Sequence, residues 1–394
     1  MRSIGFAARS LVRQPGRTVL GILGIAAVGA LLFDMLLLSR GLVVSFRDLL
    51  DGIGFDVRVT ATDSPLPGGV RLTDSTSLVS VVAGLPSVSD AVPMRTATGV
   101  FVLSGGRRRS AAVTGMDPGP RRPWTLMSGR DVASAETPEV IVNERLMDDL
   151  ATPLGSVVSV RLECDAELAA PVARPFRLVG VAQFPFDSEG QETAAVSFST
   201  LRKACGDDDH ADMLMVASKT GAADAVGAIR AARPDVYAVT NEQIVARMQA
   251  QNFTYFRQIS TVLSTITLLF GFLLITVLLT VSVNQRLGEI AALRALGFSR
   301  ARAAADVLAQ GAMLIAAGGT LALPLGTALS IWLDRILKSM PGIPAAMHFF
   351  VFEPRALIWH VALLVTTALL ASAYPMWLVA RLPIATTLRN EVVG

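Results

Sequence analysis

Long runs of apolar residues dominate the hydrophobic pattern of this 394-residue chain and separate it into apolar and polar stretches. Each run has roughly 20 to 27 residues, enough to cross about 30 Å of hydrocarbon as a helix. The runs are Thr18–Leu38, Ile259–Val283, Val307–Leu333 and Ala356–Ala380, and Asp34 is the formally charged residue inside them. The pattern therefore predicts an α-helical membrane protein with four transmembrane helices. These helices are expected at residues 18–40, 259–283, 307–333 and 356–380.

The long polar stretch at residues 41–258, between the first two runs, is large enough for a domain with its own core. Its hydrophobic residues alternate in short segments separated by Gly and Pro clusters, which indicates a large α+β domain. Predicted strands are Phe55–Ala61, Gly99–Leu103, Ser110–Thr114, Glu139–Asn143, Val157–Leu162, Pro175–Ala182 and Met213–Ala217. Predicted helices are Thr200–Cys205 and Ala222–Ala232.

Helical patterns also border this domain on both sides. Ser39–Leu50 continues the first apolar run, and Asn241–Gln258 leads into the second. We interpret them as two stalk helices that hold the domain away from the bilayer. The alternative is that they are ordinary surface helices of the domain.

Arginine placement predicts the orientation of the chain, because basic residues flank membrane helices mainly on the cytoplasmic side. Residues 1–17, 284–306 and 381–394 each carry an excess of arginine over acidic residues. We therefore expect these segments in the cytoplasm, and residues 41–258 and 334–355 outside. The first run is too long for the apolar core of a signal peptide, so we expect it to remain as an anchor.

Composition and motifs exclude several functions. The net charge is only +3, with arginines at the membrane flanks, so nucleic-acid binding is not expected. Histidines 210, 348 and 360 lie far apart, and no phosphate-binding loop accompanies Leu103–Arg107, which imitates an ABC ATPase signature. We expect no catalytic, cofactor or metal site. Asp207–His210 is interpreted as a solvated acidic loop, and Arg107–Arg109 as a solvated hairpin tip.

Three further residues are candidates for a special role. Cys164 and Cys205 both fall in the outer segment, where they either form a disulfide or remain two free buried thiols. Asp34 lies inside a membrane helix, where ionisable residues usually face the protein interior. Asp34 either takes part in transport or forms a polar contact between helices.

The third apolar run is rich in small residues, which allow helix backbones to approach closely in lipid. These residues are Gly311, Ala312, Ala316, Gly318, Gly319, Ala322 and Gly326. The four runs offer no row of charges for an ion path. We therefore expect tight helix packing and not a polar pore.

The loop between the second and third runs contains a short amphipathic segment. Ile290, Leu293 and Leu296 form an apolar stripe at helical spacing. Charge around the stripe comes from Arg286, Glu289 and Arg294. Such a helix either floats at the membrane interface or docks onto a soluble partner.

Several segments together resemble the FtsX-like permease family, the membrane subunits of MacB-type ABC systems. In the membrane part they are Arg286–Gly297 followed by Ser299–Arg300, Gly318–Gly326 and Tyr374–Arg389. In the outer segment, Ser128–Arg130, Glu139–Val142 and Phe176–Val181 resemble the MacB-like periplasmic core domain.

The resemblance implies a non-catalytic permease subunit of an ABC export or mechanotransmission complex in the inner membrane. Its partners would be a separate cytoplasmic ATPase, a second permease copy, membrane lipids and, in export systems, a periplasmic adaptor. The cargo class would be lipid, lipoprotein or amphipathic compounds. The helix in the loop would couple to the ATPase through Arg286, Glu289, Ile290, Leu293, Arg294, Leu296 and Gly297. The alternative is a regulatory protein that activates a cell-wall hydrolase or sensor partner without a transported substrate.

Overall fold

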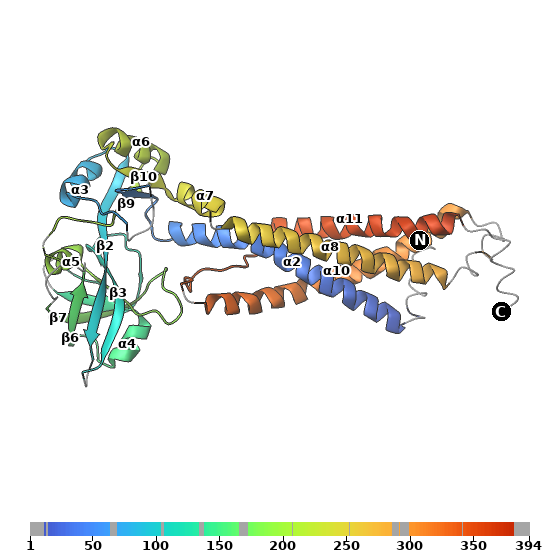
Figure 1. Cartoon of the computed structure of the whole chain (residues 1–394), viewed down its shortest axis with the longest axis horizontal. Helices are drawn as coiled ribbons and strands as arrows, with labels where there is room; N and C mark the ends of the chain where they lie inside the picture. The colour runs from blue at the N-terminus through green and yellow to red at the C-terminus, as the bar shows by residue number, and fades with distance from the viewer. Residues whose placement is uncertain are drawn as a thin grey trace. The chain divides into compact units, whose positions relative to one another are not determined.

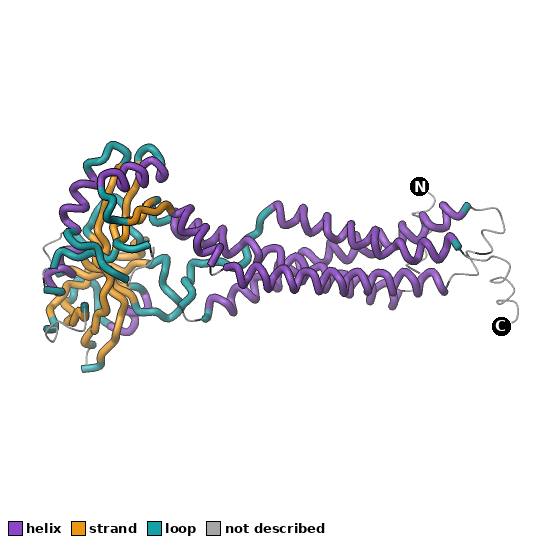
Figure 2. The backbone as a smooth tube through the Cα atoms, turned by 45° about the horizontal axis from the view of Figure 1, so that its top comes forward, coloured by secondary structure: helices purple, strands orange, loops and turns teal. Residues whose placement is uncertain are grey.

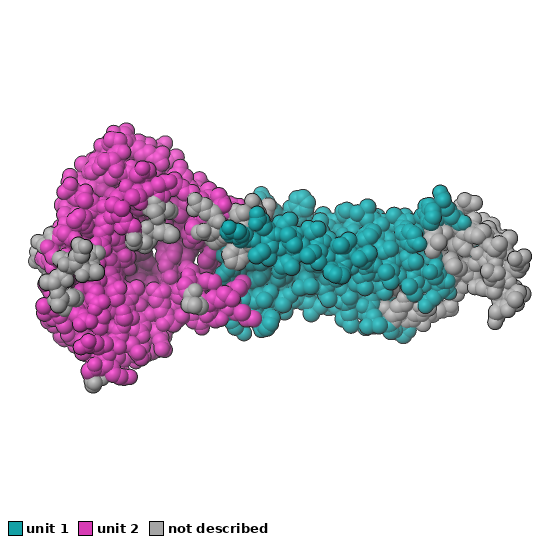
Figure 3. Space-filling view, in the orientation of Figure 1, with its two compact units in different colours: residues 1–42, 253–335, 349–394 teal, residues 43–252, 336–348 magenta. Residues whose placement is uncertain are grey.

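The structure, a computed structural model, divides the chain into two compact units. It describes residues 12, 15–63, 69–103, 106–133, 138–164, 172–206, 208–251, 253–285, 291, 299–340 and 342–381. The helical unit takes its described residues from 1–42, 253–335 and 349–394, and the sheet unit takes them from 43–252 and 336–348. Figure 3 colours the two units separately.

The helical unit is built from α8 (Phe253–Asn284), α11 (Pro354–Ala380) and most of α2 (Pro15–Asp51) and α10 (Arg300–Lys338), whose ends at 43–51 and 336–338 belong to the sheet unit. Figure 2 shows these helices as purple tubes running side by side. Among the described residues, four helices are long and apolar enough to cross a membrane, which confirms the predicted number. The helices are longer than the apolar runs: α2 extends to Asp51, and α10 begins at Arg300 rather than near Val307.

Close glycine contacts show how α2 and α10 pack. A Cβ added to Gly318 would lie 2.7 Å from Cβ of Ile25, and one added to Gly29 would lie 2.8 Å from Cβ of Ala322. The contact positions rise together along both helices, so α2 and α10 run parallel. The glycine-rich third run thus packs tightly, as its sequence predicts.

Helices α2 and α8 run in opposite directions. A Cβ on Gly24 of α2 would lie 2.9 Å from Leu274 of α8, and a Cβ on Gly271 of α8 would lie 2.9 Å from Val28. As the position on α2 rises, the position on α8 falls, so these helices are antiparallel. The same alternation of direction is expected when successive helices cross one bilayer.

The sheet unit contains a ten-stranded sheet in its described residues, with strand order β10-β1-β9-β2-β3-β8-β5-β7-β4 and β6 pairing with β2 and β7. The strands are β1 (Val57–Thr60), β2 (Val88–Val102), β3 (Arg108–Met116), β4 (Thr125–Gly129), β5 (Glu139–Val142), β6 (Val157–Glu163), β7 (Arg174–Gln183), β8 (Thr193–Val196), β9 (Met213–Ser218) and β10 (Tyr237–Thr240). The helices are α3 (Ser75–Ala83), α4 (Glu144–Leu150), α5 (Phe198–Ala204), α6 (Ala222–Ala232) and α7 (Asn241–Gln251).

Six of these strands close into a ring. The pairings run β2-β3-β8-β5-β7-β6 and back to β2, because β6 bonds to both β2 and β7. Alternate residues of each strand point into one buried core, as in β6, where Val158, Val160 and Leu162 are buried. We call this part the barrel lobe. Its interior is filled by side chains, as expected for a small barrel.

The other end of β2 carries the second lobe. There β2 pairs with β9, which pairs with β1, which pairs with β10. Helices α3 and α6 lie beside these strands (Figure 1), and Leu78, Val82 and Ile229 pack from them onto the sheet. We call this part the helix-covered lobe. The 15-residue strand β2 belongs to both lobes.

The strands and helices expected from the sequence are present in this unit, and additional elements accompany them. The expected strand Gly99–Leu103 is only the end of β2, which begins at Val88. Helices α3 and α4 and strands β4, β8 and β10 were not expected. The expected stalk helix Asn241–Gln258 is divided between two helices, α7 and the beginning of α8. Residue 252, between them, lies outside the described residues.

Candidate functional site

Asp34 is a buried acidic residue between two helices of the helical unit. Its exposed fraction is 0%, and Oγ of Ser330, on α10, donates a hydrogen bond of 2.6 Å to its Oδ1. Ser330 is itself 3% exposed. The geometry is that of a polar contact between helices. The alternative, a transport role for Asp34, stays a prediction.

A second buried polar residue, His360, lies close to Asp34 on the fourth helix. Its exposed fraction is 1%, and its ring lies edge-on to Phe33 with centroids 5.2 Å apart. Within the described part of the chain, neither ring nitrogen of His360 has a hydrogen-bond partner, and neither does Oδ2 of Asp34. His360 was expected to have no role in a metal site, and its burial between helices was not predicted, because histidine carries no formal charge in the apolar runs.

The surroundings of these polar atoms are apolar. Phe33 packs with Leu37 and Ala356 in a buried cluster, and Leu36, Leu323 and Phe350 border it. Polar atoms are costly in such a medium unless they find hydrogen-bond partners. Burying the unpaired polar atoms of Asp34 and His360 in this apolar cluster is therefore energetically costly.

Several other hydroxyl groups of the described spans donate to their own helices, whereas Oγ of Ser282 on α8 donates to Oε1 of Gln310 on α10 at 3.2 Å. Thr276 donates to the carbonyl oxygen of Phe272 at 2.7 Å, and Ser372 donates to that of Ala368 at 2.7 Å. Thr320 does the same with Ala316. Because these groups bond to the backbone behind them, they do not line a polar path along the helices.

The expected ATPase-coupling residues belong to the loop between α8 and α10. Arg286, Glu289, Ile290, Leu293, Arg294, Leu296 and Gly297 lie outside the described residues. Their role stays a prediction from the sequence.

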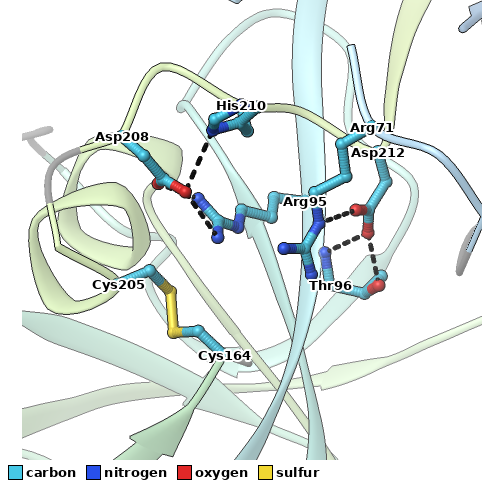
Figure 4. The surroundings of a disulfide bond; sticks show 8 residues. All are labelled: Arg71, Arg95, Thr96, Cys164, Cys205, Asp208, His210 and Asp212. Carbon is cyan, nitrogen blue, oxygen red and sulfur yellow. Dashed lines mark hydrogen bonds and ion pairs between the residues drawn. A yellow bond between two sulfur atoms is a disulfide. The ribbon is translucent and has the colours of Figure 1, made fainter. Parts of the chain in front are cut away.

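A disulfide between Cys164 and Cys205 lies in the barrel lobe (Figure 4). Cys164 directly follows β6, and Cys205 directly follows α5, and the two cysteines are 41 positions apart in the sequence. The bond therefore fixes α5 to the ring of strands. Of the two alternatives that the sequence left open, the structure has the joined one.

The segment after this disulfide carries a cluster of ion pairs, so the expectation of a solvated acidic loop is wrong for residues 208–210, while Asp207 lies outside the described residues. Oδ1 of Asp208 accepts a 2.5 Å hydrogen bond from Nη1 of Arg95, whose side chain is 0% exposed. His210 contacts the other oxygen of Asp208 at 3.0 Å (Figure 4). Burial raises the pKa of Asp208, but Arg95 and His210 outweigh it and hold that pKa below its usual value.

The neighbouring acids bind the helix-covered lobe. Asp209 accepts hydrogen bonds from Oγ of Ser75 and from the backbone and hydroxyl of Thr76, at the first turn of α3. Asp212 accepts from Arg71 at 3.0 Å and from the backbone of Thr96 at 2.7 Å. Residues 208–212 thus fasten the crossover between the lobes to β2 and α3.

The arginine tip of the β2–β3 hairpin is partly tied down. Arg109 lies 3.2 Å from Asp149 and 3.6 Å from Glu192, whereas Arg107 and Arg108 are exposed. In the described part of the chain, no group of three His, Cys, Asp or Glu residues lies close enough to hold a metal ion.

The connection between α10 and α11 contacts the barrel lobe within the sheet unit. The backbone of Ala345 donates to the carbonyl oxygen of Asp187 at 2.7 Å, and Ser188 forms a β-bridge with Pro344. The backbone of His348 donates to Oγ of Ser45 on α2 at 2.7 Å. We call residues 342–348 the strap. Nothing in its sequence pattern predicted this contact.

Asp187, to which the strap bonds, is itself held by buried partners. Its carboxylate accepts hydrogen bonds from Nδ2 of Asn143 at 2.8 Å and from Oγ1 of Thr193 at 2.7 Å. Burial raises the pKa of Asp187, and these two hydrogen bonds partly offset that rise. The turn that receives the strap is therefore anchored to α4 and β8.

Four long apolar helices, with an α+β unit inserted between the first and second, define a membrane permease with a large extramembrane domain. Residues 18–232 match the MacB-like periplasmic core domain, and residues 261–384 match the C-terminal domain of FtsX-like permeases. The chain therefore belongs to the family of MacB-type, FtsX-like ABC permeases. Permeases of this family are membrane subunits that work with a separate ATPase and dimerise.

Two solved structures are similar to part of the chain. The periplasmic region of MacB from Actinobacillus actinomycetemcomitans is 14% identical, covers 51% of this chain and 95% of its own, and has a TM-score of 0.37. The extracellular domain of the noncanonic ABC-type transporter YknZ from Gram-positive bacteria is 14% identical, covers 46% and 98%, and has a TM-score of 0.35. No curated protein sequence matches this chain.

Proposed function

We propose that this chain transmits ATP-driven motion from a separate cytoplasmic ATPase to its sheet unit, which handles lipid, lipoprotein or amphipathic cargo outside the inner membrane. The N- and C-terminal segments and residues 284–306 face the cytoplasm, and a second permease copy completes the complex. A periplasmic adaptor joins it in an export system.

The observation that carries this proposal is the length of the helices. Helix α2 has 37 residues and α10 has 39. At about 1.5 Å per residue they are roughly 55 to 60 Å long, whereas the hydrocarbon layer is about 30 Å thick. A helix that continues unbroken beyond the bilayer can carry a displacement from one side to the other.

Tight packing supports the same role. The glycines of α2, α8 and α10 bring their backbones into close contact, so a push on one helix is passed to its neighbours. The strap offers a second link, because it joins the chain between α10 and α11 to the turn at Asp187 and Ser188.

The absence of a polar path along the described spans supports transmission over conduction. Hydroxyl groups such as those of Thr276, Thr320 and Ser372 bond to their own helices. An ion pathway needs rows of polar or charged groups facing a lumen. The cargo is therefore handled by the sheet unit and does not pass through the four helices.

The proposal is tested by substitutions in the predicted coupling helix. Glu289→Lys and Leu293→Asp are expected to reduce both the amount of ATPase that co-purifies from detergent and the ATPase turnover. Loss of one anchoring contact costs about 2 kcal/mol or more, which is a reduction of more than about tenfold. The matched control is Asp148→Lys, a charge reversal at an exposed position of α4.

Unchanged association and turnover in both coupling variants would refute the docking role. The other proteins in the same purification separate the two functional classes. A co-purifying adaptor supports export, whereas a cell-wall hydrolase or sensor kinase supports the regulatory alternative.

A further inference from the structure

Helices α2 and α11 together carry three buried polar atoms that have no hydrogen-bond partner among the described residues. They are Oδ2 of Asp34 and both ring nitrogens of His360. Leaving a buried donor or acceptor unpaired costs about 1 to 3 kcal/mol per group. Asp34 offers a hydrogen-bond acceptor and His360 offers a donor, and the two side chains lie on neighbouring helices. A different packing of the same helices would allow them to bond to each other.

His360 lies against residues 29–33 of α2, the turn that precedes Asp34. Its ring contacts Phe33, the residue before Asp34, and its Cε1 lies 3.7 Å from where a Cβ on Gly29 would be. Leu364, one turn further along α11, packs in the same cluster as Ile25. As positions on α11 rise, positions on α2 fall, so the two helices are antiparallel. A movement of α11 toward the Asp51 end of α2 therefore brings His360 toward Asp34.

The interface between α2 and α11 is suited to such a movement. The contacts near His360 on α2 are made by Gly29 and Phe33, which offer no polar group that would fix the register. A crevice borders the same interface where α8 meets the two helices, and it is lined on α2 by Ile25, Val28 and Leu32, on α8 by Leu268, Gly271 and Ile275, and on α11 by Leu364 and Thr367. Incomplete packing there lowers the cost of sliding, because fewer close contacts have to be broken.

We infer that Asp34 and His360 are a switch pair that joins in a second packing of the helices. In that state α11 has moved along α2 by about one helical turn, roughly 5 Å, and an imidazole N–H donates to Oδ2 of Asp34. Ser330 keeps its bond to Oδ1. The pair stabilises the second packing relative to the one described here. This inference rests on the proposed function, because the movement is the one that the helices transmit.

Cysteine cross-linking in native membranes tests the approach of the two residues. The test variant combines Asp34→Cys and His360→Cys in the full-length protein. After oxidation, disulfide formation is detected by the change in electrophoretic mobility of the chain. Phe33→Cys with His360→Cys is the positive control, since these rings are in contact. Asp34→Cys with Ser372→Cys is the negative control, because Ser372 lies three turns away on α11. The native cysteines are already joined to each other.

We expect the Asp34–His360 cysteine pair to cross-link several-fold above the negative control, and more so when ATP is added to membranes that contain the ATPase. Cross-linking at the level of the negative control in both conditions would overturn the inference. In membranes without the ATPase, cross-linking measures how often the helices adopt the second packing in the absence of ATP-driven motion. Failure of the proposed function is seen separately, as loss of ATPase co-purification with the unmodified chain.

A second variant keeps the inference testable if the cysteine chains do not reach the membrane. Asp34→His and His360→Asp are introduced singly and together. Exchange restores the pair only if the two side chains meet, so the double variant is expected to recover ATP-driven turnover that each single variant loses. A merely structural role predicts that the double variant is as inactive as the worse single variant.

Discussion

At the scale of single residues, the hydrogen bond from Ser330 lowers the energetic cost of burying the carboxyl group of Asp34. Its hydroxyl supplies the one hydrogen bond that the described residues give to this side chain. Arg95 has the corresponding place in the sheet unit, where a fully buried guanidinium is paired with Asp208. In both cases a buried polar group depends on a partner that is distant in sequence.

Replacing Ser330 by Ala is expected to lower the free energy of unfolding of the chain in detergent by about 1 to 3 kcal/mol, because both oxygens of Asp34 then lack a donor. Denaturant or thermal unfolding of the purified protein measures the change. Ser372→Ala is the matched control, since its equally buried hydroxyl bonds only to its own helix. Equal losses in the two variants would contradict the importance of the Asp34 contact.

Residue-scale features differ in how far the sequence predicts them. Asp34 stands out because a charge inside an apolar run is visible without a structure. His360 does not, because histidine counts as neutral, so its apolar run contains no formal charge. The partner of Arg95 lies 113 positions away, and no local pattern connects two residues at that distance.

At the scale of helices and strands, close backbone contact is the main feature of the helical unit. Gly318 on α10 lies against Ile25 and Ile22 of α2, with no room for a side chain. Because lipid tails are as apolar as the helices, packing of this kind is what holds membrane helices together. The glycine positions therefore set the distance between α2 and α10.

Gly318→Ala is expected to destabilise the chain by about 1 to 3 kcal/mol, because the new methyl group overlaps Ile25 and forces the helices apart. Unfolding in detergent measures this. Gly227→Ala on α6 is the control: nothing lies within 4 Å of the added Cβ, so the better helix propensity of Ala should stabilise by up to about 1 kcal/mol. A neutral or stabilising result for Gly318→Ala would argue against close helix packing there.

Element-scale prediction succeeds where the signal is long. Apolar runs of more than 20 residues predict membrane helices from length alone, and α6 shows helical periodicity over its 11 residues. Strands β8 and β10 have four residues each. All four residues of β8 are buried, so no alternation marks it as a strand.

At the scale of the whole molecule, the sheet unit is closed by connections between distant segments. The ring of the barrel lobe needs β6 to pair with both β2 and β7, and β3 to pair in parallel with β8. Sequence patterns identify several of these strands but do not specify which strands are neighbours. The disulfide between Cys164 and Cys205 adds a covalent link to the same ring.

Removing this link by the double substitution Cys164→Ser and Cys205→Ser is expected to lower the free energy of unfolding by about 2 to 4 kcal/mol, since the unfolded chain regains the freedom of a loop closed over 41 positions. Unfolding with and without a reducing agent provides the measurement. Reductant should lower the stability of the unmodified chain and leave the double variant unchanged. An equal response of both proteins would contradict a stabilising disulfide.

The pairing of β1 with β10 also sets the order of events during synthesis. Val57 lies opposite Thr240 in the sheet, so the first strand of this unit waits for its neighbour until nearly the whole unit has left the ribosome. At about 5 to 20 residues per second, the roughly 180 residues between them take on the order of 10 to 40 seconds. During that interval the nascent chain exposes strand edges and apolar side chains, so its biogenesis calls for chaperone protection on the side of the membrane where this unit emerges.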